Sequence, residues 1–224
     1  MLLSRRADRL RALAEELEGE YEVCDVRDRD SVEQVAAAIQ KRHRAVHLLV
    51  NSAGIPGRRS FLDIEPERLE DVLATNYLGT VWCVRAFLPA LEAAGEADIV
   101  NIVSVAGTVA FPPSGPYSAS KHAQLAFSRA TAAELAPKGI RVHTVNPGFV
   151  ETEGFPQRNV LRSRFFRRAV IPVERVAEHV ASSIEQGRGE TFVPGWYRVF
   201  ALAQAVAPGL VARRGMRRGY RRPS

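Results

Sequence analysis

A tyrosine and a lysine stand four residues apart in Tyr117-Ser118-Ala119-Ser120-Lys121, and Ser104 precedes the tyrosine by thirteen positions. Because one helical turn separates residues i and i+4, we expect the phenol and the ammonium to lie on one helix face. A phenol has an ordinary pKa of about 10, and a nearby cation lowers that pKa enough for acid–base work near neutral pH. The Ser104 hydroxyl could hold a carbonyl oxygen while the tyrosine transfers a proton. These residue types predict a centre that interconverts a ketone and an alcohol, given a hydride carrier.

The segments around these residues alternate between strand-like and helix-like patterns. Apolar runs predict strands over 21–26, 46–50, 98–103, 140–145 and 190–193. Amphipathic spacing predicts helices over 7–17, 30–42, 65–91, 115–136 and 173–186, the second of them capped by Asp30 and Ser31. This alternation predicts an α/β fold, a doubly wound parallel sheet with helices on both faces. Asn51 and Ser104 directly follow predicted strands, at the edge where such sheets bind ligands.

Together the motifs resemble the classical short-chain dehydrogenase/reductase family over nearly the whole chain, with a Rossmann-like fold. The family's Asn-Asn-Ala-Gly signature is similar to Asn51-Ser52-Ala53-Gly54, and its Pro-Gly stretch followed by threonine is similar to 147–152. The resemblance implies that the catalytic residues are Asn76, Ser104, Tyr117 and Lys121. It gives Asn76, which lies inside the predicted helix 65–91, the role of holding a water that links Lys121 to solvent.

The resemblance also implies a nicotinamide cofactor. Asp25 and Val26 would contact the adenine, while Tyr117 and Lys121 would also contact the cofactor. The remaining implied contacts are Asn51, Ala53 and Gly54 at the adenosine ribose, and Pro147, Gly148, Val150 and Thr152 at the carboxamide. Ser4 stands where relatives that prefer NAD carry an acid, and the guanidinium of Arg5 suits a 2′-phosphate. We therefore expect NADP rather than NAD.

The glycine-rich turn that holds the cofactor pyrophosphate in this family has no counterpart here, since the first glycine is Gly19. The start of the chain is similar to the end of the family's second strand, so we expect the first βα unit to be missing. That unit supplies a central strand, and without it the strands before residue 27 would separate from the strand at 46–50. This predicts a second function to weigh against an oxidoreductase: a catalytically silent protein that serves as a binding or interaction module.

Each candidate residue also has a structural interpretation. Tyr117 and Lys121 could be a surface pair, Ser104 a turn cap and Asn76 a structural asparagine. Asp25 could end a strand in a turn, and Arg5 could be a solvated charge. His122 and His143 lack partners at metal-ligand spacing, so we expect structural histidines and no metal. Cys24 and Cys83 are expected to be buried free thiols in a reducing compartment.

Composition predicts a soluble globular protein, with 46% apolar and 25% charged residues among 224. We expect one domain over 1–212 and a basic, flexible tail over 213–224. The net charge of +6 resides in that tail, which holds six arginines and no acid. The tail could be solvated, contact an anionic membrane surface, or attract nucleic acid without sequence preference.

The sequence gives only indirect indications of the location, the oligomeric state and the substrate of the protein. No signal peptide is expected, and the apolar stretch 199–212 is too short to span a membrane, which predicts a cytoplasmic protein. The resemblance implies a homodimer or homotetramer paired through helices 66–91 and 117–136. An apolar carbonyl or alcohol substrate is expected from the residues around the motifs, which are Val105, Val109, Ala110, Phe111, Phe149 and Phe155.

Overall fold

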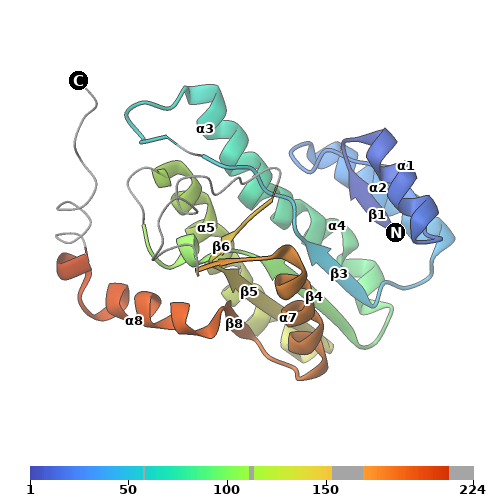
Figure 1. The fold of residues 1–224 in the computed structure, drawn as a ribbon. Helices are drawn as coiled ribbons and strands as arrows, with labels where there is room; N and C mark the ends of the chain where they lie inside the picture. The colour runs from blue at the N-terminus through green and yellow to red at the C-terminus, as the bar shows by residue number, and fades with distance from the viewer. Residues whose placement is uncertain (58, 111–113, 153–168, 212–224) are drawn as a thin grey trace.

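The computed structural model describes residues 1–57, 59–110, 114–152 and 169–211. The predicted tail and most of the segment after Thr152 therefore lie outside the described residues. The strands are β1 (Leu2–Ser4), β2 (Tyr21–Val23), β3 (Leu48–Asn51), β4 (Ala97–Ile102), β5 (Ile140–Pro147), β6 (Phe149–Val150), β7 (Val170–Ile171) and β8 (Glu190–Val193). The α-helices are α1 (Ala7–Glu16), α2 (Arg29–Arg42), α3 (Pro66–Leu73), α4 (Gly79–Glu92), α5 (Gly115–Leu135), α7 (Val173–Glu185) and α8 (Arg198–Val206). Figure 1 shows their arrangement.

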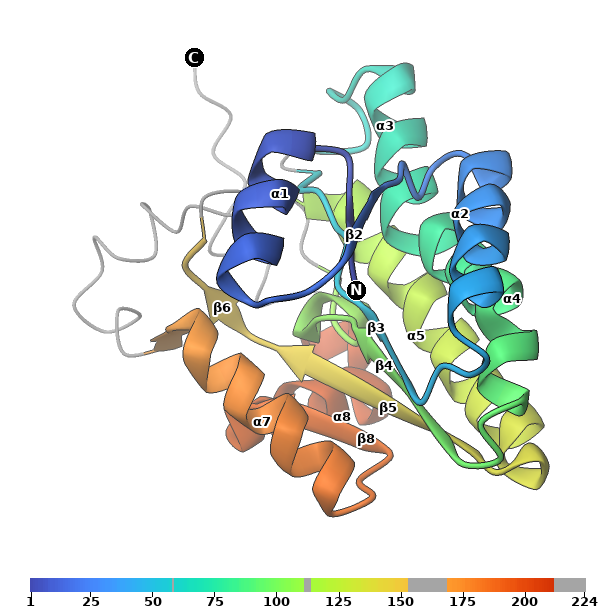
Figure 2. The same ribbon diagram turned by 90° about the vertical axis from the view of Figure 1, so that its right-hand side faces the viewer.

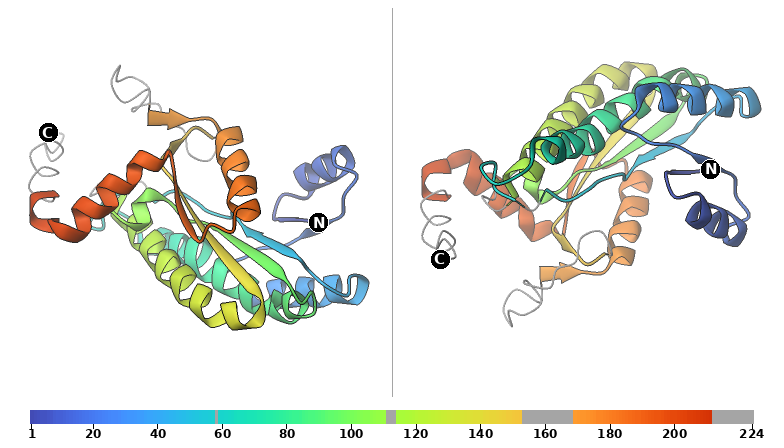
Figure 3. Two further views of the ribbon diagram at one scale, coloured as in Figure 1. Left: turned by 90° about the horizontal axis from the view of Figure 1, so that it is seen from below. Right: turned by 90° about the horizontal axis from the view of Figure 1, so that it is seen from above.

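The main sheet is parallel throughout, in the order β3-β4-β5-β8. Helices α2, α4 and α5 lie on one side and α7 covers the other face of the main sheet, while α1 packs on that second side against β1 and β2 (Figures 2 and 3). Buried side chains of the strands, such as Leu49 and Ile99, pack against Leu91 and Leu135 of the first helical layer. The predicted doubly wound α/β fold, with helices on both faces of a parallel sheet, is confirmed.

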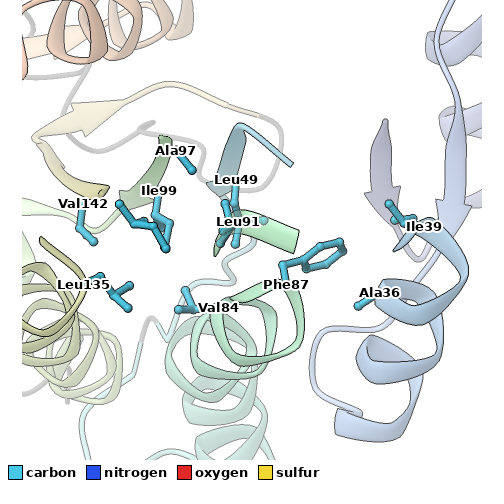
Figure 4. Packing of buried hydrophobic residues seen from close by; sticks show 11 residues of the cluster. Ala36, Ile39, Leu49, Val84, Phe87, Leu91, Ala97, Ile99, Leu135 and Val142 are labelled. Atoms are coloured by element: carbon cyan, nitrogen blue, oxygen red, sulfur yellow. The ribbon is translucent and has the colours of Figure 1, made fainter. Parts of the chain in front are cut away.

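The first two strands form a separate parallel sheet. Within the described part of the chain, β3 pairs with β4 alone, so its other edge faces away from any strand partner. This confirms the expected separation of the N-terminal strands from the strand near residue 50. Helix α2 joins the two parts, because Ala36 and Ile39 pack in the same cluster as Phe87 of α4; Figure 4 shows the Phe87 ring pointing toward them.

Several element boundaries differ from the sequence-based expectation. Helix α2 is capped by Asp28, not by Asp30 and Ser31, because an extended Asp28 places its Oδ1 2.9 Å from the backbone nitrogen of Asp30. The strand predicted to reach residue 26 ends at Val23. The helix predicted over 65–91 is continuous in space, but a π-helical turn, η1 (Ala74–Leu78), separates α3 from α4.

The two leucines of β3 provide a test of how the sheet is covered. Leu49 is 9% exposed within the core, whereas its neighbour Leu48 is 47% exposed. We expect Leu49→Ala to lower the free energy of unfolding by about 2–4 kcal/mol and Leu48→Ala to lower it by less than about 1 kcal/mol, because only the first change opens a cavity. Urea unfolding of both variants measures the difference. Equal losses would mean that the Leu48 face is also covered in solution.

Candidate active site

The structure brings Ser104, Tyr117 and Lys121 together beyond the carboxyl end of β4. Ser104 directly precedes a 3₁₀ turn, η2 (Val105–Gly107), while Tyr117 and Lys121 occupy successive turns of α5. The Ser104 hydroxyl is hydrogen-bonded to the Tyr117 phenol. The Lys121 ammonium lies 5.9 Å from the centre of the Tyr117 ring. Spacing along the chain therefore predicted a cluster that exists in space.

Ser104 is hydrogen-bonded to Tyr117 and also has the turn-capping role that was its structural alternative. Its Oγ accepts a hydrogen bond from the backbone nitrogen of Ala106 at 3.1 Å, which caps η2. The same hydroxyl lies 3.4 Å from the carbonyl oxygen of Pro147, to which it can donate. The hydroxyl is thus held between β4, β5 and α5, at the point where their ends meet.

Tyr117 differs from the expectation in its protonation. Burial raises the pKa of its phenol to about 12, and the hydrogen bond from Ser104 only partly offsets this. The expected lowering of the pKa by Lys121 is therefore not what this arrangement gives. A phenol with so high a pKa is fully protonated near pH 7, which is the form that donates a proton.

Lys121 is buried, with 4% of its surface exposed. Its Nζ donates to the carbonyl oxygen of Ile102 at 2.9 Å and to Oε1 of Gln124 at 2.6 Å. Both acceptors are neutral, and burial lowers the pKa of the ammonium to about 7. The amine is thus poised to change charge close to neutral pH.

Asn76 lies in the π-helical turn, a feature often found at functional sites. Its amide oxygen accepts from the backbone nitrogen of Ile55 at 2.7 Å, and its amide nitrogen donates to the Ile55 carbonyl and to Ser120 Oγ, both at 3.0 Å. Ser120 Oγ in turn donates to the carbonyl of Tyr117 at 2.8 Å. Asn76 therefore fixes the loop after β3 against the helix that carries Tyr117. Its role in holding a water stays a prediction.

Asn51 takes part in a buried polar chain behind the site. Its amide nitrogen donates to Asn101 Oδ1 at 2.9 Å, Asn101 donates to Ser128 Oγ at 2.9 Å, and Ser128 shares a 2.6 Å hydrogen bond with Thr144. This chain ties β3, β4 and β5 to α5. The side chain of Asn51 thus stabilises the central strands, whereas Ala53 is exposed beyond it.

Gly54 lies next to Asn76 and Lys121. A Cβ at this position would lie 3.5 Å from Asn76 Oδ1 and 3.9 Å from Lys121 Nζ, which are ordinary contacts. The described packing therefore leaves room for a small side chain there, and the glycine is not required by crowding from the protein itself.

The residues expected at the adenine also come together, through the ends of β1 and β2. Arg5 lies 3.9 Å from the carboxylate of Asp25. The guanidinium of Arg27 forms ion pairs with Asp25 at 2.8 Å and with Asp71 at 2.6 Å. Arg27 was not among the site residues predicted from the sequence. Hydrogen bonding from Arg27 holds the pKa of Asp25 below its ordinary value, although burial opposes this. Val26 packs tightly on Gly79, where a Cβ would lie 2.7 Å from Val26 Cγ2.

A hollow of about 420 Å³ opens beside this ion-pair group. Its lining residues are Asp25, Arg27, Asp28, Glu67, Glu70, Asp71 and Ala74. Five of these side chains are acids and one is basic, so the hollow carries a negative field. It contains none of the catalytic candidates.

The stretch after β5 is shaped by packing on Tyr197. A Cβ on Gly148 would lie 2.2 Å from the Tyr197 ring, so the glycine is required by that ring. Phe149 contacts the same ring edge to face, at 6.5 Å between centroids. Val150 pairs with Ile171 in the short β6–β7 sheet. Of these residues, Pro147 lies beside Ser104, and the cofactor contacts of Pro147, Gly148, Val150 and Thr152 remain predictions.

The apolar residues expected to face the substrate behave differently from that expectation. Val105 is buried in a cluster with Phe192 and Tyr197, the half-buried Phe149 packs against that cluster, and Val109 is buried. Ala110 is exposed. Phe111 and Phe155 lie outside the described residues. The sequence-based argument for an apolar substrate therefore loses most of its residues.

The histidines and cysteines have structural surroundings. His143 is buried between Asp98 Oδ1 and the carbonyl of Arg188, both at 2.7 Å, and His122 contacts the Ser118 carbonyl at 2.8 Å. Cys24 and Cys83 are buried free thiols, as expected, and burial raises the pKa of Cys83 to about 12. Over the described ranges, no helix has the length and apolarity to cross a bilayer, and no group of side chains suits a metal ion.

The residues fit one half of a nicotinamide cofactor. Ser104, Tyr117 and Lys121 gather at one edge, with the Pro147–Gly148 turn beside Ser104. Among the residues that the structure describes, no glycine-rich turn precedes α1, and Gly19 lies beyond that helix. The candidate residues for the nicotinamide end therefore lie together, and their binding of a cofactor remains a prediction.

Comparison with known proteins matches this chain to dehydrogenases and reductases. The profile of short chain dehydrogenases matches residues 1–160. A Streptomyces coelicolor protein provisionally named as a ketoacyl reductase is 33% identical over 198 residues, which cover 88% of this chain and 74% of that protein. Other relatives are covered over about half of their own length, 47% in one case and 53% in another.

Solved structures agree in fold. A short-chain dehydrogenase from Burkholderia cenocepacia, determined with NADP, is 29% identical with a TM-score of 0.73, over 87% of this chain and 78% of that one. A short-chain dehydrogenase/reductase from Burkholderia phymatum, determined with NAD, has the same fold at 24% identity with a TM-score of 0.79, over 100% of this chain and 87% of that one. The chain belongs to the short-chain dehydrogenase/reductase family of oxidoreductases.

Proposed function

We propose that this protein is an NADP-dependent oxidoreductase that converts the carbonyl group of a small molecule to an alcohol. The observation that carries the proposal is the Ser104–Tyr117 hydrogen bond beside the buried Lys121. A bound nicotinamide cofactor supplies the hydride. The chain itself supplies the hydroxyl groups of Ser104 and Tyr117, which can both hydrogen-bond the carbonyl oxygen of the substrate. Tyr117 is the one that transfers its proton to that oxygen.

In this mechanism Ser104 donates a hydrogen bond to the carbonyl oxygen and stabilises the negative charge that develops there. The Tyr117 phenol, protonated at neutral pH, gives its proton to that oxygen. Lys121 in its charged form then favours the phenolate that remains and would also bind the nicotinamide ribose. Asn76 keeps the loop at Gly54 and helix α5 in fixed relation, so that these groups stay aligned. The protonated phenol is the form of Tyr117 that the reduction requires.

Arg5 supports NADP, since its guanidinium lies at the end of β1 and is exposed. The solved relatives were determined with NADP and with NAD, so they favour neither. We expect Arg5→Ala to weaken NADPH binding about tenfold and to leave NADH binding within about twofold, because only NADPH carries the 2′-phosphate. Arg6→Ala, the neighbouring exposed arginine, is the matched control. Calorimetric titration measures all four affinities, and equal effects of the two variants would contradict the assignment.

The substrate class is tested with a panel that includes 3-oxoacyl thioesters, as suggested by the name of the Streptomyces relative, and simple ketones. Oxidation of NADPH is followed by absorbance with the purified protein. Turnover of a panel member supports the proposal, and the Tyr117→Phe variant described in the Discussion tests its mechanism. Assembly as a homodimer or homotetramer through α3–α4 and α5, a single domain over 1–212, and a cytoplasmic location belong to the same proposal.

The second candidate is a catalytically silent member of the family that acts as a binding or interaction module. The split between the β1–β2 sheet and β3 favours it. Calorimetry with NADPH separates the two functions. Micromolar binding supports the enzyme, and no binding at millimolar NADPH supports the silent module.

A further inference from the structure

We propose that Gln124 is a positioning residue that holds the Lys121 ammonium in its charged form and in one place. The proposal rests on the function proposed above. Gln124 lies three residues after Lys121 in α5 and is completely buried. Its Oε1 accepts from Lys121 Nζ at 2.6 Å. Its Nε2 donates to Thr80 Oγ1 at 2.9 Å, across to α4.

The polarity of this chain of hydrogen bonds is fixed by the groups at its two ends. An ammonium only donates, so Gln124 must present its oxygen to Lys121 and its nitrogen to Thr80. Thr80 Oγ1, which accepts from Gln124, lies 3.5 Å from the backbone carbonyl of Asn76 and can donate to it. A single orientation of the amide therefore satisfies the whole chain, which leads from Lys121 to the π-helical turn.

The Gln124 amide oxygen accepts a hydrogen bond from the Lys121 ammonium, in place of a water molecule that would accept it in solution. Among the described residues, Lys121 Nζ donates to two acceptors, the Ile102 carbonyl of β4 and Gln124 of its own helix. Hydrogen bonds to the charged form of a group favour that form. The other groups close to Nζ are the neutral side chain of Asn76 in η1, the loop at Gly54, and Tyr117, which is the titratable one. Removing the Gln124 oxygen would leave one acceptor.

Two variants at this position should move the titration of Lys121 in opposite directions. Gln124→Leu retains much of the volume but removes the acceptor, so we expect the Lys121 titration to move down by about one pH unit. Gln124→Glu places a carboxylate beside the ammonium, so we expect a shift upward by at least about one unit. Thr80→Val removes only the anchor of the amide, and its shift should be downward and smaller.

The chain contains three lysines, Lys41, Lys121 and Lys138, so side-chain NMR of ¹⁵N-lysine-labelled protein resolves Lys121 directly. This titration needs no substrate or turnover, and so it decides the role of Gln124 even when the proposed activity fails. In the active protein, kcat/KM for NADPH-dependent reduction should fall as the pH rises. The midpoint of that fall should shift in each variant as the Lys121 titration does. Shifts of the two variants in the same direction, or no shift in well-folded variants, would overturn the proposal.

Discussion

Replacing Tyr117 by phenylalanine should lower kcat for carbonyl reduction by about 10³-fold, within the range known for the loss of a general acid. The ring remains, so its contact with the Lys121 side chain is preserved, and only the proton-carrying oxygen is lost. Since burial keeps the Tyr117 phenol protonated, with a pKa of about 12, this oxygen is the proton donor at neutral pH. We expect NADPH affinity to change by less than about threefold. Single-turnover oxidation of NADPH, monitored by absorbance, separates the chemical step from binding.

Tyr77→Phe is the matched control for this variant. Tyr77 lies in the same region, within η1, and contacts Phe127 edge to face at 6.5 Å between ring centroids. Its hydroxyl has no part in the mechanism, so turnover should stay within about twofold of the wild type. A Tyr117→Phe protein that binds NADPH and reduces the substrate at the wild-type rate would place the proton donor elsewhere.

The succession of elements could be predicted because each one carries its own local signal. The apolar run at β4 and the proline at the start of α3 depend on neighbours in the chain, and the structure places both elements where expected. The π-helical turn at Asn76 could not be predicted this way. Its side chain bonds Ile55 and Ser120, residues 21 and 44 positions away, so the local geometry is tied to tertiary contacts.

The separation of the sheet was predicted for a similar reason. The resemblance places one strand between β1 and β3, and no described strand fills that place, so β1 and β3 have no common neighbour. The structure shows that separation, and it adds what the sequence did not show: α2 holds the two parts together through Ala36 and Ile39.

In the candidate site too, residues recognised by local spacing could be predicted, whereas roles that depend on contacts distant in the sequence could not. Tyr117 and Lys121 were found from a one-turn spacing, and Ser104 from its place after a strand. Gln124 is also one turn from Lys121, yet its meaning comes from Thr80, which lies 44 positions away. Gly148 was assigned to the cofactor, whereas its contact with Tyr197 gives it a packing role that no local pattern reveals.

The titration of Lys121 should make the free energy of unfolding depend on pH. Burial lowers the pKa of this lysine from 10.5 to about 7, so between these values the unfolded chain binds a proton that the folded protein has released. Stability from this group therefore rises as the pH increases from 7 toward 10.5, and it falls to a constant low level below pH 7. Lys121→Met has no such titration. We expect its stability relative to the wild type to decrease by about 2–3 kcal/mol between pH 6 and pH 9.

Urea unfolding at intervals across this pH range measures the difference, with Lys138→Met as the control at an exposed lysine paired with Glu92. The same Lys121→Met protein should lose carbonyl reduction, because no cation remains to favour the Tyr117 phenolate. A buried amine that destabilises the folded state at neutral pH, yet is needed for turnover, is the pattern expected when burial serves the reaction. If the wild type and Lys121→Met had parallel stability curves from pH 6 to pH 9, Lys121 would titrate as it does in water, and the buried position assigned to its ammonium would be wrong.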